Sequence, residues 1–150
     1  MKLKVFVLAV MMAGVVSCGS DGKKSDNAAE PAAQEAVELD PMKDKGIGPI
    51  KSMTLEAIDE GMAATGKEVF KTKCSACHKM SKRFVGPALA GVTERRTPEW
   101  IMNMILNPEE MIVKDPIAKA LLMEFNGAPM ANQNLTEEQA RQVLEYFRTL

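Results

Sequence analysis

From about residue 47 onward, apolar residues recur at helical spacing, and no stretch alternates convincingly between apolar and polar with period two. A first helix is predicted to start at residue 59 or 60 and to run toward Lys73. Gly66 lies inside this helix, where a glycine costs about 1 kcal/mol relative to alanine. We therefore expect the backbone of another element to approach Gly66 closely.

Capping residues and prolines predict two middle helices. Thr97 and Pro98 form a helix start, and Pro108 ends the segment that follows them. Asp115-Pro116 repeats the start signal, and Gly127 closes the second of these helices. Both helices are therefore short.

A capping box of the S/T-x-x-E/Q type, formed by Thr136 and Gln139, begins the last helix. Its apolar face consists of Val143, Leu144, Phe147 and Leu150. The chain is therefore predicted to be all-α, with about four helices and no sheet.

The N-terminus carries targeting signals. Lys2 and Lys4 precede an apolar run over residues 5–16, which is too short to span a bilayer but has the length of a secretory signal core. The residues that follow, up to Cys18, resemble the bacterial lipoprotein box. We expect residues 1–17 to be a signal peptide and Cys18 to be lipidated; the alternative is an ordinary cleaved signal with a stray thiol.

Residues 18–46 are polar, acidic and rich in alanine, which predicts a flexible linker. A coil of this length has a root-mean-square span of about 30 Å. A globular domain over residues 47–150 is then held near a membrane by the N-terminal lipid, on the periplasmic side or at the cell surface.

Composition restricts the chemistry. The 150 residues include 19 Lys and Arg against 20 Asp and Glu, which disfavours a nucleic-acid-binding tail. Aromatic residues make up 5% and methionines number 12, so the core is filled by aliphatic side chains and thioethers, or around something that is not protein. Three cysteines and one histidine exclude a disulfide scaffold and are too few for a Cys/His zinc site without further ligands.

The only histidine follows two of the cysteines in Cys74-Ser75-Ala76-Cys77-His78. Two thiols at this spacing can both add to the vinyl groups of one haem, and the adjacent histidine is then placed to bind the iron. A redox C-x-x-C pair or half a zinc site is the alternative, but neither needs this histidine. The motif predicts one covalent haem c, attached to Cys74 and Cys77, with His78 as an iron ligand.

With this motif, residues 61–150 resemble the class I monohaem cytochromes c. Gly66-x-x-x-Phe70 and Val143-x-x-Tyr146 are similar to the crossing of the terminal helices in that family. The resemblance implies the cytochrome c fold, with about four helices around one haem.

The same resemblance implies roles for three residues around the haem. The carbonyl of Pro87, in Val85-Gly86-Pro87-Ala88-Leu89, accepts the ring N–H of the histidine ligand, and Leu89 lies against the haem. Trp100, the only tryptophan, donates its indole N–H to a haem propionate as in some relatives, or else serves only in packing.

The sixth iron ligand separates an electron carrier from a catalyst. The sequence has no second histidine, so a methionine thioether is expected. Met130 follows Gly127-Ala128-Pro129 in a predicted loop that resembles the ligand loop of the family, although Ala131 stands where many relatives have proline. Met123 is the alternative, but it lies in a predicted helix, where core packing explains it better.

Charge is unevenly distributed along the domain. Residues 66–96 carry eight basic and two acidic side chains, a net charge of +6, whereas residues 97–150 carry −4. A basic surface near the haem edge would attract an acidic redox partner; the alternative is an ordinary solvated face.

These features predict an electron carrier and not an enzyme. Its iron would cycle between Fe(III) and Fe(II) between respiratory redox partners, such as a cytochrome bc-type complex and a terminal oxidase or periplasmic reductase. The alternative is a haem enzyme or gas sensor with an open distal iron site, but the chain offers no distal histidine for peroxide chemistry.

Overall fold

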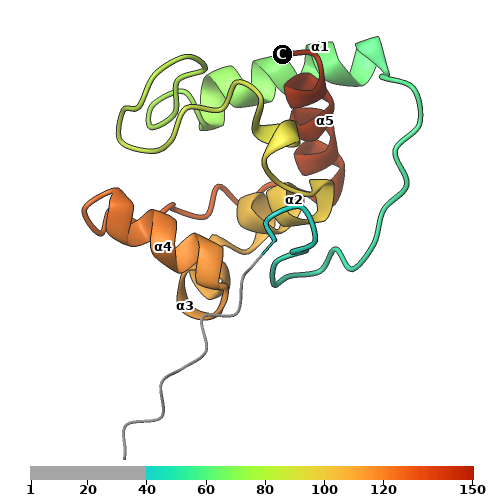
Figure 1. Cartoon of the computed structure of the whole chain (residues 1–150). Coiled ribbons are helices and arrows are strands. Elements are labelled where there is room, and N and C mark those ends of the chain that lie inside the picture. The colour runs from blue at the N-terminus through green and yellow to red at the C-terminus, as the bar shows by residue number, and fades with distance from the viewer. Residues whose placement is uncertain (1–39) are drawn as a thin grey trace, which may run out of the picture. The chain divides into compact units, whose positions relative to one another are not determined.

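Five α-helices and one short 3₁₀ helix follow one another in the computed structural model, which describes residues 40–150 (Figure 1). They are α1 (Glu60–Lys73), η1 (Val92–Glu94), α2 (Pro98–Leu106), α3 (Pro108–Lys114), α4 (Pro116–Glu124) and α5 (Glu137–Arg148). Residues 40–150 contain no strand, and none of their helices is long and apolar enough to cross a membrane. The predicted signal peptide, Cys18 and most of the predicted linker lie outside the described residues.

The predicted starts of α1, α2, α4 and α5 are confirmed by their caps. In each helix the side chain of the N-cap residue accepts a backbone N–H of the first turn, these residues being Asp59, Thr97, Asp115 and Thr136. Gly127 adopts φ +72° and donates its N–H to Leu122 O at 2.8 Å, which ends α4 as predicted.

The all-α prediction is confirmed, and α3 is one helix more than the roughly four that were expected. Pro108 does follow the end of α2, but it is also the first residue of α3. Proline is tolerated there because the first N–H of a helix has no intrahelical acceptor. Asn107 makes no side-chain cap, and its Nδ2 donates instead to Glu110 and to Ile47 O. The sequence does carry the usual start signal here, Asn107-Pro108-Glu109, but Pro108 also follows the end of α2, and the prediction used it only for that end.

Helices α1 and α5 cross closely (Figure 1). A Cβ built on Gly66 would lie 1.9 Å from the carbonyl oxygen of Gln142, so the two backbones touch at this point. The ring of Phe70 then lies 5.8 Å from that of Tyr146 and 5.9 Å from that of Phe147. The expected close approach at Gly66 is thus confirmed, and it explains a glycine inside a helix.

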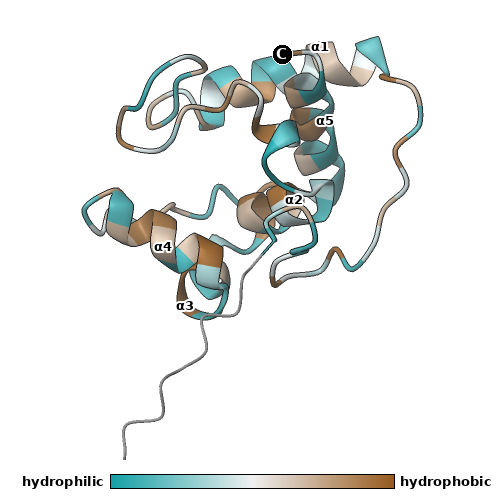
Figure 2. Ribbon diagram, in the orientation of Figure 1, coloured by the Kyte–Doolittle hydropathy of each residue, from teal (hydrophilic) through white to brown (hydrophobic). Residues whose placement is uncertain are grey.

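The core lies between this crossing and helices α2 to α4. Figure 2 shows apolar residues concentrated in α2 and α4 and alternating with polar ones on α5. The buried apolar side chains include Phe70, Trp100, Ile101, Met102, Ile105, Met111, Ala118, Val143, Leu144 and Phe147. Leu150, predicted on the apolar face of the last helix, lies beyond its end and is 47% exposed.

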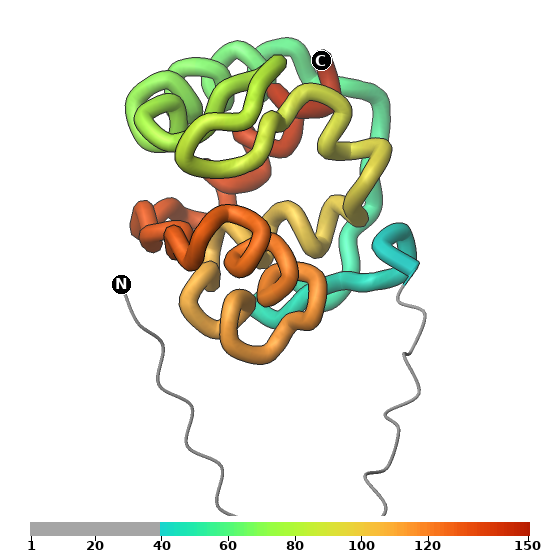
Figure 3. The backbone as a smooth tube through the Cα atoms, turned by 60° about the vertical axis from the view of Figure 1, so that its left-hand side comes forward, coloured from blue at the N-terminus to red at the C-terminus, as the bar shows by residue number. Residues whose placement is uncertain are grey.

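Residues 44–58 form a strap that runs along one side of the molecule from α2 to α1 (Figures 1 and 3). Asn103 of α2 is fully buried beneath it. Its Nδ2 donates to Lys45 O (2.9 Å) and Ile50 O (2.8 Å), and its Oδ1 accepts from Ile50 N (3.0 Å). The packed part of the chain therefore extends to residue 44, slightly before the predicted domain start at residue 47.

Candidate functional site

The two spaced cysteines lie in a tight turn that ends α1. Cys74 is the C-cap, and its N–H donates to Phe70 O. The N–H groups of Cys77 and His78 both donate to Cys74 O, at 3.1 and 2.9 Å. Both thiols are free, with Cys74 half-buried and Cys77 exposed. The turn therefore presents two sulfur atoms and one imidazole within five residues.

His78 has its ring held in one tautomer. Its Nδ1 lies 3.1 Å from the carbonyl oxygen of Pro87. Because a carbonyl only accepts, Nδ1 carries the proton and donates, which leaves the lone pair on Nε2. Burial lowers the pKa of His78, although the hydrogen bond to Pro87 acts in the opposite direction. The ring is therefore neutral at neutral pH, which is the form that binds metal ions.

The loop after the histidine packs against the imidazole. A Cβ added to Gly86 would lie 2.5 Å from Cε1 and 2.9 Å from Nδ1 of His78. Backbone hydrogen bonds fix this loop, from Gly86 N to Cys77 O (3.0 Å) and from Leu89 N to Lys79 O (3.1 Å). The sequence analysis identified Pro87 but not Gly86, whose contact with the ring appears only in three dimensions.

The thiol chemistry disfavours a redox-active cysteine pair. Burial, together with the neighbouring Cys77, raises the pKa of Cys74 to about 11. A thiol of a disulfide oxidoreductase needs the opposite shift, because the thiolate is its nucleophile. Within residues 40–150, no three His, Cys, Asp or Glu side chains form a cluster that could hold a metal ion. Neither alternative use of the motif is supported by these residues.

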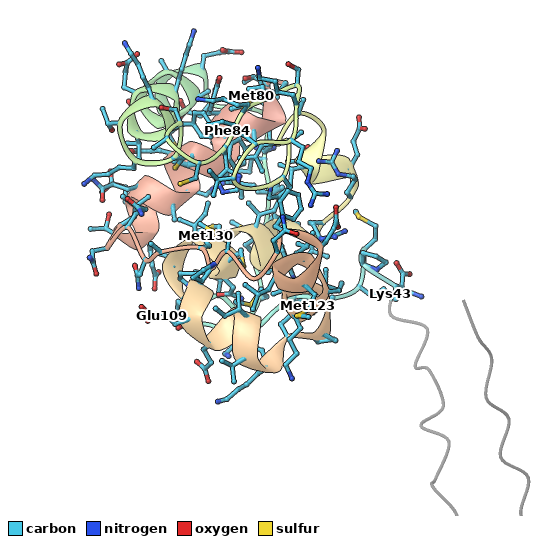
Figure 4. All side chains as sticks on the ribbon, turned by 90° about the vertical axis from the view of Figure 1, so that its left-hand side faces the viewer. Lys43, Met80, Phe84, Glu109, Met123 and Met130 are labelled. Atoms are coloured by element: carbon cyan, nitrogen blue, oxygen red, sulfur yellow. The ribbon has the colours of Figure 1, made fainter. Side chains whose placement is uncertain are left out.

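The methionines occupy distinct environments. Met130 is half-buried and lies on the segment that connects α4 to α5. In Figure 4 its label stands below that of Met80 and above that of Met123. Met123 is 77% exposed. Met111 is fully buried, and its Sδ accepts the N–H of Ile47 at 3.0 Å, so this thioether serves the core. Met130 is therefore neither a core residue nor a freely solvated one.

The indole of Trp100 is buried against a carboxylate of this chain. Its indole N–H donates to Asp115 Oδ1 at 3.2 Å, and the residue is only 5% exposed. An indole has a single N–H, so a hydrogen bond to a propionate would compete with this one. Trp100 is thus packed in the core with its N–H bound to Asp115, and its role beside a haem propionate stays a prediction. Leu89 is half-buried against the core cluster.

The basic segment, residues 66–96, carries exposed apolar side chains near its centre. Phe84 is 53% and Val85 46% exposed, and Lys79 Nζ lies 5.1 Å from the Phe84 ring centroid. Arg83 is paired with Glu124 at 2.9 Å. The other lysines of the segment are exposed, these being Lys67, Lys71, Lys73 and Lys82. We call residues 79–85 the basic apolar loop.

Taken together, the donor set fits a covalently attached haem. Two free thiols stand at the required spacing, and a neutral imidazole is oriented through Nδ1 with Nε2 left available. Gly86 leaves no space for a side chain over that ring. A half-buried thioether, Met130, lies on a separate segment of the chain.

Comparison with known proteins agrees with this donor set. The family model for cytochrome c matches residues 63–150. The chain is 31% identical to cytochrome c-551 of Ectopseudomonas mendocina, over 58% of this chain and 99% of that protein. It is also 31% identical to cytochrome c2 of Rhodopseudomonas palustris, over 59% of this chain and 97% of that protein.

Solved structures show the same relationship. The cytochrome c from Rhodothermus marinus is 48% identical, with a TM-score of 0.66 over 68% of this chain and 88% of that one. The cytochrome c domain of the pp3183 protein from Pseudomonas putida is 30% identical, with a TM-score of 0.52 over 56% and 85%. The chain therefore belongs to the cytochrome c family, as an electron-transfer protein that carries a covalent haem c and is not an enzyme.

Proposed function

We propose that this protein is a membrane-tethered electron carrier between respiratory redox proteins, in which His78 and Met130 are the two axial iron ligands. The observation that carries the ligand assignment is the His78 ring, which is neutral, fixed through Nδ1 and free at Nε2. A haem bound there supplies a reversible one-electron change at iron. The protein has to hold the same ligands in both oxidation states.

The chain's own residues divide this task. Cys74 and Cys77 anchor the group covalently, and the Pro87 carbonyl orients His78 and increases the basicity of its Nε2. Gly86 prevents the ring from being displaced by a side chain of its own loop. A soft thioether from Met130 would raise the reduction potential and close the second axial position to small molecules.

The environment of each methionine favours Met130 over the alternatives. Met111 is used in the core, and Met123 is mostly solvated on α4. Met130 lies in the segment between α4 and α5 and packs only partly against the core. Its side chain can therefore turn toward the iron without opening a cavity among the fully buried core residues.

Exchange of single methionines tests the assignment. In the haem-loaded protein, we expect Met130→Ala to abolish the weak far-red sulfur-to-iron absorption band and to let carbon monoxide bind at once to the ferrous form. The matched control is Met123→Ala, which should leave both properties unchanged because Met123 is solvated.

Two results would contradict this ligand set. Loss of the far-red band in Met123→Ala instead would assign the thioether to α4. A wild-type protein that is high-spin and binds carbon monoxide immediately would favour the alternative, a haem enzyme or gas sensor with an open iron site.

The basic apolar loop supports an acidic redox partner. Phe84 and Val85 give it an exposed apolar centre next to the exposed Cys77, and Lys79 and Lys82 surround them with positive charge. Apolar contact allows close approach, and the charges steer the encounter. A partner with an acidic rim, such as a bc-type complex, a terminal oxidase or a periplasmic reductase, matches this surface.

The tether is proposed from the N-terminal sequence. Residues 1–17 have the pattern of a lipoprotein signal, and Cys18 follows it directly. Two or more acyl chains on Cys18 would hold the protein at the membrane surface. The protein should therefore sediment with membranes and be released by detergent; recovery in the soluble fraction would oppose the proposal.

A further inference from the structure

Two aspartates meet where the strap joins the helices. Asp115, the N-cap of α4, is 1% exposed, and its Oδ1 accepts hydrogen bonds from Ala118 N (2.7 Å) and Trp100 Nε1 (3.2 Å). Asp44 comes from the strap, and its Oδ1 accepts from Gly46 N at 2.8 Å. A Cβ built on Gly46 would lie 3.2 Å from Trp100 Cδ1, so the strap places the Asp44 carboxyl group beside the indole that binds Asp115.

One atom of this pair lacks a partner. Among residues 40–150, Asp44 Oδ2 is buried and accepts no hydrogen bond. An unsatisfied buried polar atom typically costs about 1–3 kcal/mol. Two ionised carboxylates in contact would also repel each other, so one of them tends to retain its proton. A proton between them would remove both costs, because it turns one oxygen into a donor.

The charged groups around the pair do not replace that proton. Arg96 is the cation attracted by both aspartates, but its Nη1 donates to Arg95 O. The lysines adjacent in sequence pair elsewhere, Lys43 with Asp40, Lys45 with Glu99 and Lys114 with Glu110. The positive charge of Arg96 opposes protonation of the pair without supplying a hydrogen bond to Asp44 Oδ2.

We propose that Asp44 and Asp115 bind a single proton between them, and that this shared proton fastens the strap to α2 and α4. The bond is an O–H···O⁻ hydrogen bond, with the proton held on either carboxyl group. In agreement, burial raises the pKa of Asp115, and the neighbouring Asp44 adds to this effect, although the N–H groups of Ala118 and Trp100 lower it. The strap carries the connection to the N-terminal tether, so the proton would set how firmly that connection is held.

The sign of the pH effect follows from linkage. When the strap opens, the two carboxyl groups separate and Asp115 returns to its ordinary pKa, for which the reference value is 3.8. The folded pair keeps its proton above that pH, so its contribution is complete at lower pH and is lost as the pH rises through the folded pKa. Between the two pKa values, the opening equilibrium of the strap should increase about tenfold per pH unit.

Amide hydrogen exchange of the haem-loaded protein between about pH 4 and pH 9 tests this proton, after correction for the chemical exchange rate. Strap peptides of the wild type should show the tenfold increase per unit over part of this range. Asp44→Asn should remove the increase, because an amide donates to Asp115 and does not titrate. Asp40→Asn is the control, since Asp40 is exposed and outside the strap, and it should retain the wild-type profile.

The outcomes are decisive in both directions. A pH dependence that is the same in wild type and Asp44→Asn, or absent from both, overturns the proposal. If Asp44→Asn does not fold, Asp115→Asn keeps the cap oxygen and offers the same test. The infrared band of a protonated carboxyl group in the wild type gives an independent answer, because its absence above about pH 5, where exposed aspartates are ionised, also overturns it.

Discussion

His78 is held by two residues of its own loop that act in different ways. The carbonyl oxygen of Pro87 accepts a hydrogen bond from Nδ1–H and so fixes Nε2 as the nitrogen that is left for a metal. Gly86 has no side chain, and this lets its backbone lie directly against the imidazole of His78. Orientation and basicity of the ligand are therefore determined by adjacent positions.

Replacing Gly86 by alanine should disturb this arrangement. The added Cβ would lie 2.5 Å from Cε1 of His78, so the ring has to move away and its bond to Pro87 weakens. Loss of a hydrogen bond that supports a metal-binding histidine typically costs about 10–100-fold in affinity or activity. We expect a higher reduction potential and a shifted Nδ1 proton resonance in the haem-loaded variant.

A control in the same loop distinguishes a specific effect on the position of His78 from a general increase in loop flexibility. Ala90 is exposed, and Ala90→Gly should increase the freedom of the loop without contacting the ring. If Gly86→Ala and Ala90→Gly change the potential and the proton resonance equally, Gly86 has no specific role in positioning His78.

At the scale of elements, most helix starts could be predicted from the sequence, but only some of the contacts between helices and the strap could. A side-chain cap is a local signal, and α2, α4 and α5 were located from it, whereas α1 was located from apolar residues at helical spacing. Helix α3 was not predicted, because Pro108 both follows α2 and begins α3, and only its role in ending α2 was recognised. Asn103 was also not recognised, since its partners lie more than fifty residues away in the strap.

The crossing of α1 and α5 makes a second prediction. Gly66→Ala would place a Cβ 1.9 Å from the Gln142 carbonyl oxygen, and a backbone cannot move aside as a flexible side chain can. We expect a loss of about 3 kcal/mol in the free energy of unfolding, at the upper end of the range for overpacking. Urea unfolding of the haem-loaded protein measures this loss.

Gly61→Ala in the same helix is the matched control. Its Cβ would meet only the carboxylate oxygen of Asp59, at 3.2 Å. Helix propensity alone favours alanine by about 1 kcal/mol, so the control should be close to neutral or stabilised. An increase in stability for Gly66→Ala would contradict the close contact between the helices.

At the scale of the molecule, charge and apolar surface coincide. The basic segment over residues 66–96 contains both the haem-attachment motif and the basic apolar loop. The rest of the domain is acidic, so the molecule has an uneven charge distribution despite a net charge of only −1 for the chain. Such a distribution orients a partner during encounter, and salt screens it.

Reversing one charge on the loop should therefore slow electron transfer. We expect Lys82→Glu to reduce the bimolecular rate with an acidic acceptor protein severalfold at low ionic strength, and to converge with wild type at high salt. Lys51→Glu makes the same change of charge on the strap and should have little effect. Equal effects of the two variants in stopped-flow measurements would show that net charge, and not the loop, controls docking.

By itself, the sequence determined the all-α class and the covalent haem motif with its histidine, because each depends on residues that are close together in the chain. The pairing of Pro87 with that histidine was expected only from the resemblance to a known family, and the structure shows it. The tertiary structure decided what depends on distant residues meeting. In the fold, the indole N–H of Trp100 donates to Asp115, and Met111 lies in the core. The fold also places Asp44 of the strap close to Asp115, the N-cap of α4. Local spacing predicts chemistry within a turn, whereas the partners of a buried polar group are fixed only when the chain folds back on itself.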